Sequence, residues 1–316
     1  MKNLFRSSGV QEFRSSGDEN HNPVNPVILS IKSISIFIIH ISSFIFLSSC
    51  SPNPEIPKSP NSQIRLLSLA PNLTEMLAAI DASPLLVGRS DSCDFPADLT
   101  RLPSVGEFGN PNLEKILALR PTHVVYTDLQ DKSIPETLRR YNIDIREISC
   151  SGLHHIAPAF RLLGELTGHR GKAEALATQL ETRLAELRAN VAENPPAVFL
   201  LLWNDPLITI GSDSFISDLV LLAGGRNVFD DVPNAYFNVP PEQAVSRNPD
   251  IILSLVSEKP GTLAPVLAKN PGWAATRALR ENRVIEGLPL DIICRPGPRV
   301  MEAIEALQEA LEKPCL

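Results

Sequence analysis

The chain has 316 residues, a length that allows two domains. It is 43% hydrophobic and 21% charged, a composition typical of a globular protein rather than a disordered or fibrous one. The formal net charge of −7 disfavours nucleic acid as a partner, because proteins that bind nucleic acid present a basic footprint.

The first 26 residues are polar and irregular. They contain the sequence Phe-Arg-Ser-Ser-Gly twice, at 5–9 and 13–17. We expect a disordered extension here, or a gene start placed too far upstream. No Met lies between Met1 and Met76, so a shorter product would need a non-Met start codon.

Residues 27–47 form an apolar run apart from serines, one lysine and one histidine. The run ends in Leu47-Ser-Ser-Cys50, which resembles the lipobox of bacterial lipoproteins. That resemblance implies a signal peptide, cleavage before Cys50 and a diacylglyceryl group on the Cys50 sulfur. A plain transmembrane anchor is the alternative, since about 20 residues can span a bilayer. Both interpretations place residues 51–316 outside the cytoplasm.

A polar segment with four prolines, residues 51–62, follows the proposed lipid site and is expected to act as a tether. Beyond it, the pattern of apolar residues changes to that of a folded protein. We therefore divide the chain into an extension with a signal peptide (1–49), a tether (50–63), an N-terminal lobe (64–168), a connecting helix (169–193) and a C-terminal lobe (194–316).

Short apolar stretches alternate with helical patterns in the N-terminal lobe. Such alternation predicts a parallel sheet with helices on its faces. The predicted strands are 64–69, 85–88, 123–126 and 143–148. One predicted helix follows the first strand and ends at Ile80, and two more span 134–141 and 153–166.

One long helix is predicted from about residue 170 to residue 193. Its apolar residues recur at spacings of four and three, so that they form a single stripe along one face. A helix of this length is roughly 36 Å long at 1.5 Å per residue. Pro195 and Pro196 end it. The stripe consists of Leu176, Leu180, Leu184, Leu187 and Val191.

The alternation of strands and helices resumes in the C-terminal lobe. The predicted fold class is therefore α/β, with two Rossmann-like lobes joined by a single long α-helix and a ligand cleft between the lobes. The predicted strands are 198–202, 208–210, 251–255 and 284–285, and the predicted helices are 214–223, 242–246 and 298–312.

Each lobe contains one copy of the same local pattern. Glu114 and Glu242 each open a short predicted helix, and each is followed seven residues later by a proline, Pro121 or Pro249. A β-branched strand begins two residues after each proline. A carboxylate in the first helical turn is favourable against the helix dipole, which is a sufficient reason for one such residue. The repeated spacing favours two similar lobes that each display an acidic helix start.

Sequence motifs of common enzyme classes are missing. The segment Gly168-His-Arg-Gly171-Lys172 is not a phosphate-binding loop, because Leu166 and Ala173 stand where glycine and serine or threonine are required. No HExxH or GxSxG motif occurs. We therefore predict no catalytic residues and no enzyme activity.

Metal and thiol motifs are missing as well. The five cysteines form no CxxC pair, which disfavours zinc-ribbon and thioredoxin-like folds. His154 and His155 are adjacent on a predicted helix, so their side chains would point about 100° apart and chelate one metal ion poorly. We predict no metal site.

Four further segments carry a family resemblance when they are taken in order. They are Ser68-Leu-Ala-Pro-Asn-Leu-Thr-Glu75, Gly88-Arg-Ser-Asp-Ser-Cys-Asp-Phe-Pro96, Val105-Gly-Glu-Phe-Gly-Asn-Pro-Asn-Leu-Glu114 and Cys294-Arg-Pro-Gly-Pro-Arg299. With the long helix between the third segment and the fourth, they resemble the periplasmic binding proteins that serve ABC importers of cobalamin, ferric siderophores and haem. The similarity covers about residues 64–311 and is strongest to the cobalamin-binding branch.

The resemblance implies roles for particular residues. The two carboxylates with which the family docks onto its permease dimer fall on Glu114 and Glu242. The remaining positions implied for ligand binding are Pro71 and Ser92 in the N-terminal lobe, Asp291 and Arg295 in the C-terminal lobe, and the aromatic residues Phe108, Trp203 and Tyr236.

Alternatives stay open at three of these positions. Trp203 could belong to the hydrophobic core, and Arg295 could pair with Asp291 for structural reasons. The family often carries an aromatic residue where Ser92 stands, so a ferric siderophore or haem remains an alternative ligand. A siderophore, often anionic, would favour basic residues, for which Arg89 and Arg299 are further candidates.

The function implied by the resemblance is that of an extracytoplasmic solute-binding lipoprotein. It would capture a corrinoid, or another metal chelate, and deliver it to the permease dimer of an ABC importer. We expect a monomer without a cofactor of its own, located in the periplasm or at the cell surface and held to the membrane by its lipid. An extracytoplasmic α/β hydrolase, which would need a nucleophile–base pair, and a regulatory or adhesion lipoprotein are alternatives of other classes.

Overall fold

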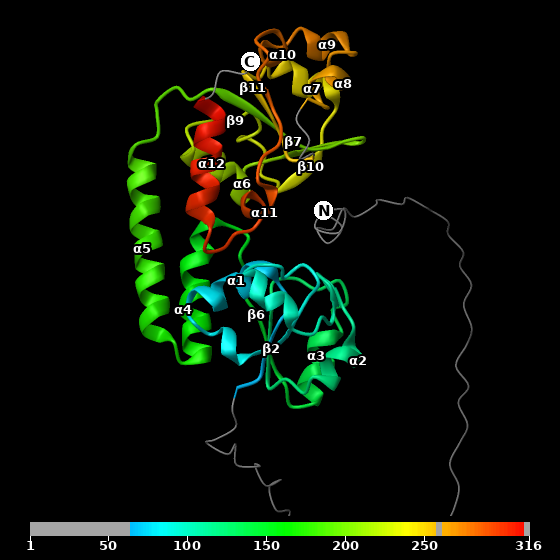
Figure 1. Ribbon diagram of the computed structural model, residues 1–316. Coiled ribbons are helices and arrows are strands. Elements are labelled where there is room, and N and C mark those ends of the chain that lie inside the picture. The colour runs from blue at the N-terminus through cyan, green and yellow to red at the C-terminus, as the bar shows by residue number, and fades with distance from the viewer. Residues whose placement is uncertain (1–63, 257–260, 313–316) are drawn as a thin grey trace, which may run out of the picture. The chain divides into compact units, whose positions relative to one another are not determined.

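A computed structural model of the protein describes residues 64–256 and 261–312 (Figure 1). The predicted extension, signal peptide, lipid site at Cys50 and tether lie outside the described residues. Among the residues that are described, no helix combines the length and the hydropathy needed to cross a bilayer.

The N-terminal lobe is built on four parallel strands in the order β2-β1-β5-β6, which confirms the predicted parallel sheet. The strands are short and mostly buried, as expected when helices cover a parallel sheet. A small hairpin, β3 (Gly106–Glu107) with β4 (Asn110–Pro111), was not predicted. The other elements are β1 (Leu66–Ser68), β2 (Leu86–Arg89), β5 (His123–Tyr126), β6 (Asp144–Glu147), α1 (Pro71–Ala79), α2 (Leu113–Ala118) and α3 (Ile134–Arg140).

Unlike the all-parallel sheet of the N-terminal lobe, the sheet of the C-terminal lobe is mixed. Its order is β10-β8-β7-β11-β12, and β9 pairs separately with β7. Strands β7 (Ala197–Asn204) and β8 (Leu207–Ile210) are antiparallel because only two residues connect them, whereas a parallel crossover needs a dozen or more. The other strands are β9 (Arg226–Asn227), β10 (Tyr236–Asn238), β11 (Ile251–Ser254) and β12 (Val284–Ile285).

The helices of this lobe include the three that the sequence predicts, α6 (Phe215–Leu222), α7 (Pro241–Ser246) and α12 (Val300–Glu312). Four short helices lie between them and were not predicted. Their four-residue length leaves no room for the helical period on which such a prediction rests. They are α8 (Ala264–Leu267), α9 (Pro271–Ala274), α10 (Arg277–Arg280) and α11 (Leu290–Ile293).

The long connecting helix is one half of a helical hairpin. Helix α4 (Ile156–Thr167) ends at Gly168, whose φ of +78° permits the left-handed turn into α5 (Arg170–Ala189). Helix α5 has 20 residues and therefore a length of about 30 Å, shorter than predicted. Figure 1 shows α4 and α5 side by side. The stripe of α5 is buried at Leu180 and Leu184 and partly buried at Leu176, Leu187 and Val191.

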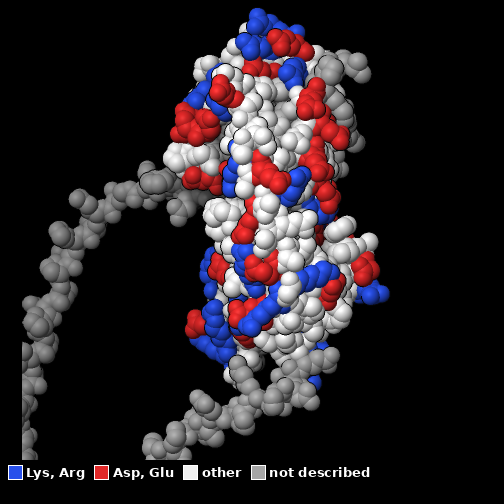
Figure 2. All heavy atoms as spheres, turned by 90° about the vertical axis from the view of Figure 1, so that its left-hand side faces the viewer, with Lys and Arg blue, Asp and Glu red and all other residues white. Residues whose placement is uncertain are grey.

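Ion pairs connect the two helices on the outer surface of the hairpin. Arg161 of α4 donates hydrogen bonds to the carboxylates of Glu174 and Glu181 on α5. Figure 2 shows the side of the molecule that α5 covers, where basic and acidic side chains are interspersed. Such a surface offers no large field of one sign to a charged partner.

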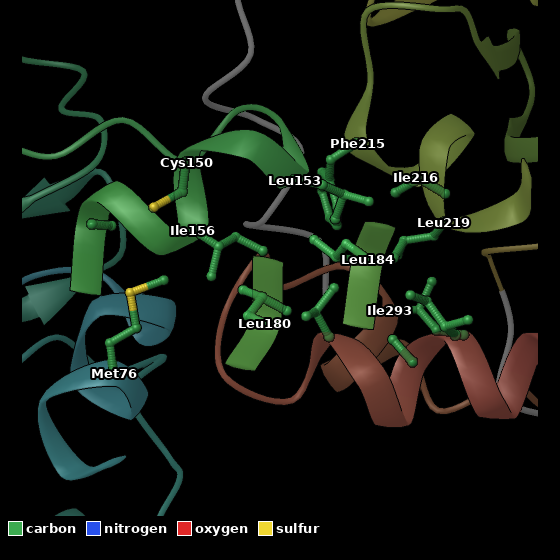
Figure 3. Close-up of a cluster of buried hydrophobic side chains, with 14 of the residues drawn as sticks. Met76, Cys150, Leu153, Ile156, Leu180, Leu184, Phe215, Ile216, Leu219 and Ile293 are labelled. Atoms are coloured by element: carbon green, nitrogen blue, oxygen red, sulfur yellow. The ribbon is translucent and has the colours of Figure 1, made fainter. Parts of the chain in front are cut away.

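One hydrophobic cluster is shared by both lobes and by the hairpin. It includes Met76 from α1, Leu184 from α5, Leu219 from α6 and Ile293 from α11 (Figure 3). The described residues accordingly fall within one compact unit. Because the two lobes bury apolar surface in the same cluster, a large hinge motion between them would expose it to water.

Candidate functional site

Strand order in the N-terminal lobe marks the edge of the sheet at which a ligand is expected. The chain passes from β1 to β2 on one side and places β5 and β6 on the other, so the order reverses between β1 and β5. In open α/β sheets, ligands bind outside the carboxyl ends of the strands at such a reversal. Pro71 opens α1 just after β1, and Ser92 lies in the loop that follows β2, so both are near this edge.

Three of the four predicted site residues of the C-terminal lobe lie at or beyond the carboxyl ends of strands, whereas Tyr236 is the first residue of β10. Trp203 is the next-to-last residue of β7, and Asp291 lies on α11, the first helix after β12. Arg295 follows the end of α11. Strands β7, β11 and β12 are parallel to one another, so their carboxyl ends share one edge of the second sheet.

Five charged side chains join the two carboxyl edges, and we call them the junction cluster. They connect the lobes directly, because each arginine comes from the C-terminal lobe and has a carboxylate partner in the N-terminal lobe. The asparagine of α1, Asn72, adds a hydrogen bond of 3.3 Å to the carbonyl oxygen of Pro296. The members of the junction cluster are Glu75, Asp94, Asp291, Arg295 and Arg299.

Arg295 is the more buried arginine of the cluster, with a side chain 8% exposed. Its Nη1 donates to Glu75 Oε1 at 3.1 Å and to Asp94 Oδ1 at 2.6 Å. Its Nη2 donates to Asp94 Oδ2 at 3.1 Å, which makes the pair with Asp94 bidentate. The Nε of Arg295 is buried and has no hydrogen-bond acceptor among the residues that the structure describes.

Arg299 uses all three of its guanidinium nitrogens. Its Nε and Nη2 donate to the two oxygens of Glu75 at 2.8 and 2.7 Å, and its Nη1 donates to Asp291 at 3.1 Å. The guanidinium carbon lies 4.2 Å from the centre of the Phe95 ring, a cation–π contact. Arg295 therefore does not pair with Asp291, which was one alternative raised by the sequence. Arg299 takes that acid instead.

The charges of the cluster are unequally exposed. Glu75 is 2% exposed and lies between the two arginines, as a buried carboxylate must if it is to remain charged. Asp94 and Asp291 are each more than half exposed and form the outer part of the cluster. The hydrogen bonds from Arg295 hold the pKa of the Asp94 carboxyl below its usual value, against the opposing effect of partial burial.

The predicted aromatic residues differ in exposure. Phe108 and Tyr236 are partly buried and pack against the cluster that both lobes share. Burial raises the pKa of the Tyr236 phenol. Trp203 is 39% exposed, and its Nε1 donates to the carbonyl oxygen of Asp205 at 2.8 Å. It is therefore not a core residue, although the sequence allowed that interpretation.

The repeated pattern around the two glutamates extends into the backbone. Glu114 and Glu242 each occupy the second position of a six-residue helix, and both side chains are exposed. The residue before the proline of each copy has a positive φ, +47° at Arg120 and +43° at Asn248. Neither glutamate forms an ion pair within the described ranges. The two copies are thus equivalent in helix length, charge position and exit geometry.

Arg89 and three of the cysteines, the other candidates raised by the sequence, are engaged within the fold itself. The Nη atoms of Arg89 donate only to backbone carbonyls, of Ser90, Asp91 and Thr100, so this arginine shapes its own loop. Cys93, Cys150 and Cys294 are free thiols, and burial raises the pKa of Cys294 to about 12. In the described part of the chain, no group of three or more His, Cys, Asp or Glu residues could hold a metal ion.

Sequence reasoning did not single out Glu75, Asp94 or Phe95. All three belong to segments that carried the family resemblance, and Phe95 is 43% exposed. A signal was available, because Glu75 is the one charged residue of its helix and a buried acid needs a basic partner. The identity of that partner, more than 200 residues away, could not be read from the sequence.

Comparison with known proteins shows that the chain is similar to binding proteins. The family described as periplasmic binding protein matches residues 66–289. A vitamin B12-binding protein of Photorhabdus laumondii subsp. laumondii is 30% identical over 275 residues, which cover 86% of this chain and 95% of that protein.

Solved structures are similar over most of the described residues. The periplasmic vitamin B12-binding protein of Vibrio cholerae superposes with a TM-score of 0.66 at 27% identity, covering 78% of this chain and 96% of the other. The periplasmic haem-binding protein of Roseiflexus sp. RS-1, in its apo form, gives a TM-score of 0.65 at 26% identity, covering 79% of this chain and all of the other. The two names differ in ligand, so the fold alone does not choose between corrinoid and haem.

Proposed function

This chain belongs to the periplasmic binding protein family, and from that premise we propose that it is a solute-binding lipoprotein that captures a corrinoid and delivers it to an ABC importer. The observation that carries the proposal is the meeting of the two carboxyl edges at the junction cluster. The 30% identity to a vitamin B12-binding protein supports the choice of ligand class. The protein binds and releases its ligand unchanged and catalyses no reaction.

The proposed ligand lies between the lobes. Exposed aromatic surface at both edges supports this position, with Phe95 after β2 and Trp203 at the end of β7. A corrin ring is large and flat, and aromatic rings make favourable contact with such a face. The residues proposed to contact it are Pro71, Ser92 and Phe108 from the N-terminal lobe and Trp203, Tyr236, Asp291 and Arg295 from the C-terminal lobe.

Delivery requires that the importer recognise both lobes. Glu114 and Glu242 are proposed to dock onto the permease dimer, one on each subunit. Their equivalent positions, their exposure and the matching backbone around them support this assignment. A dimer presents two equivalent surfaces, and a monomeric binding protein with one acid per lobe can engage both at once.

The location proposed for the protein is the periplasm or cell surface, where a lipid on Cys50 would hold it to the membrane. The ending Leu47-Ser-Ser-Cys50 supports this assignment. Mass spectrometry of the membrane-extracted protein is expected to show a diacylglyceryl group at Cys50, and the Cys50→Ala variant should remain unprocessed. A wild-type protein that carries no lipid at Cys50 would rule the anchor out.

A calorimetric titration tests the ligand. The purified protein without its first 50 residues is titrated separately with cyanocobalamin, haem and a ferric hydroxamate. The proposal expects one cyanocobalamin per protein, bound more tightly than either other compound. Haem is the second candidate, supported by the likeness to the haem-binding protein of Roseiflexus sp. RS-1. Tighter binding of haem or of the hydroxamate would replace the corrinoid as the ligand and leave the binding function in place.

A further inference from the structure

The two arginines at the junction of the lobes are already neutralised by the protein itself. Three carboxylates, those of Glu75, Asp94 and Asp291, bind the two guanidinium groups of Arg295 and Arg299. With every group in its ordinary charge state, the junction cluster carries a net charge of −1. An anionic ligand entering between the lobes would therefore meet excess negative charge rather than a cationic site.

Five of the six guanidinium nitrogens of the two arginines donate hydrogen bonds to carboxylates. All three nitrogens of Arg299 donate to carboxylates, and both Nη atoms of Arg295 do the same. The remaining nitrogen, the buried Nε of Arg295, has no acceptor among the described residues. A carboxylate or phosphate prefers the two-pronged end of a guanidinium group, which its two Nη atoms form. Asp94 already occupies that end of Arg295. A neutral amide carbonyl needs only one donor and displaces no acid.

We propose that the junction cluster selects ligands by charge, excluding anions and admitting neutral or cationic compounds, and that Asp94 is the residue that sets this preference. The inference rests on the proposed function in one respect, namely that the ligand lies between the lobes. It narrows the ligand to a neutral or cationic chelate and disfavours ferric siderophores that carry several negative charges.

Asp94 is the member of the cluster suited to this role. Glu75 is buried and holds both arginines, so its removal would disturb the junction itself. Asp291 is exposed but pairs with Arg299, whose other two nitrogens Glu75 still binds. Asp94 is 57% exposed and holds the two-pronged end of Arg295. Removing its charge would open that end to an anion while Glu75 keeps the arginine in place.

The test uses pairs of ligands that differ in charge and barely in shape. The first pair is cyanocobalamin and its monocarboxylic acid, in which one side-chain amide is replaced by a carboxylate. The second pair is haem and haem dimethyl ester, whose propionate charges are removed. Affinities are measured calorimetrically for the wild-type protein, for Asp94→Asn and for Asp98→Asn. Asp98 is an exposed acid four residues further along that bonds no residue of the junction, so it is a matched control for loss of one charge.

The expected result is that the wild-type protein binds cyanocobalamin about tenfold more tightly than its monocarboxylic acid, the effect of one repelled charge several ångströms away in a medium of intermediate dielectric constant. Haem dimethyl ester, which lacks both propionate charges, should likewise bind more tightly than haem. Asp94→Asn should reduce that ratio severalfold, mainly through tighter binding of the anionic member, while Asp98→Asn and Asp94→Glu should keep it. Equal binding of both members by the wild-type protein, or an unchanged ratio in a folded Asp94→Asn variant, would overturn the proposal. The wild-type ratio decides the matter even if the variant fails to fold.

The outcomes also separate this inference from the proposed function. Corrinoid binding without a charge preference would leave the function standing and remove the charge selection. Binding of only the haem pair, with the ester preferred, would remove the corrinoid and keep the selection. Failure of all four compounds to bind would contradict both.

Discussion

Arg295 of the C-terminal lobe forms a bidentate ion pair with Asp94 of the N-terminal lobe, with Nη1–Oδ1 and Nη2–Oδ2 distances of 2.6 and 3.1 Å. The two residues are 201 positions apart in the chain. The arginine is 8% exposed and the aspartate 57%, so the pair reaches from the buried junction to the solvent. It thereby links the position of the lobes to the surface at which the ligand is proposed to bind.

Removal of the Glu75 charge should destabilise the protein strongly. Glu75→Gln preserves the shape of the side chain and leaves two buried guanidinium groups short of their common partner. Breaking a buried ion pair in this way costs about 3–5 kcal/mol in the free energy of unfolding. Urea denaturation followed by circular dichroism measures it.

The matched control is Glu136→Gln on α3. Glu136 pairs with Arg140 at 2.6 Å, but both side chains are at least 70% exposed. An exposed pair four residues apart contributes about 0.3–0.5 kcal/mol, so this variant should be close to wild type. If the two variants lose similar free energy, the junction cluster is not a structural connection between the lobes.

The contribution of Asp94 to stability should depend on pH. Its pKa is lower in the folded protein than in the unfolded chain, chiefly because of the hydrogen bonds from Arg295. A depressed pKa stabilises the fold at pH values above the unfolded pKa of about 3.9, and the contribution is lost as the pH falls through the lower folded value. The melting temperature of Asp94→Asn should therefore lie below that of wild type at pH 7, and the gap should close below about pH 4. A gap of constant size from pH 7 to pH 2 would show that the charge of Asp94 is not its cause.

The aromatic residues should divide into two groups when they are truncated. Phe108→Ala and Tyr236→Ala should each weaken ligand binding by roughly 1–3 kcal/mol and also lower stability, because both rings pack against the shared core. Trp203→Ala should weaken binding and leave the free energy of unfolding nearly unchanged, since the indole is exposed. Calorimetry and urea denaturation measure the two quantities. The control is Tyr141→Ala, at an exposed position outside the proposed site. If all three site variants bind the ligand with wild-type affinity, the ligand binds elsewhere.

The two glutamates should act on transport and not on ligand affinity. Glu114→Ala and Glu242→Ala should bind ligand as wild type does, while uptake through a reconstituted importer falls, and the double variant should be slowest. Exposed ion pairs contribute only about 0.2–1 kcal/mol each, so the effect should fall mainly on the association rate and weaken with salt. Glu136→Ala, which removes an exposed acid from α3, is the control. Normal uptake by both single variants and by the double variant would show that the two glutamates do not dock onto the permease and that the repeat is only structural.

Local patterns predicted most of the fold. The parallel strands of the N-terminal lobe and the stripe of α5 follow from residues close together in the chain, where apolar period and strand length suffice. Strand β8 was predicted as residues 208–210 without a direction, although the two-residue link between Asn204 and Leu207 already excluded a parallel crossover.

The candidate site was less accessible from the sequence. Arg295 was singled out, but its partners Glu75 and Asp94 were not, because each pairing depends on how distant segments fold together. The pairs of Arg295 with Asp94 and of Arg299 with Glu75 join residues more than 200 positions apart. No periodicity or spacing carries such a contact, whereas the equivalence of Glu114 and Glu242 is visible because each lies inside a local motif.

A crystal structure of the protein with the compound that the titrations select tests the central claim most directly. The account predicts that the ligand lies between the two carboxyl edges, in contact with the loop after β2, with Trp203 and with the exposed side of the junction cluster at Asp94 and Asp291. A ligand bound to one lobe alone, or on the face covered by α5, with the junction cluster untouched, would contradict it.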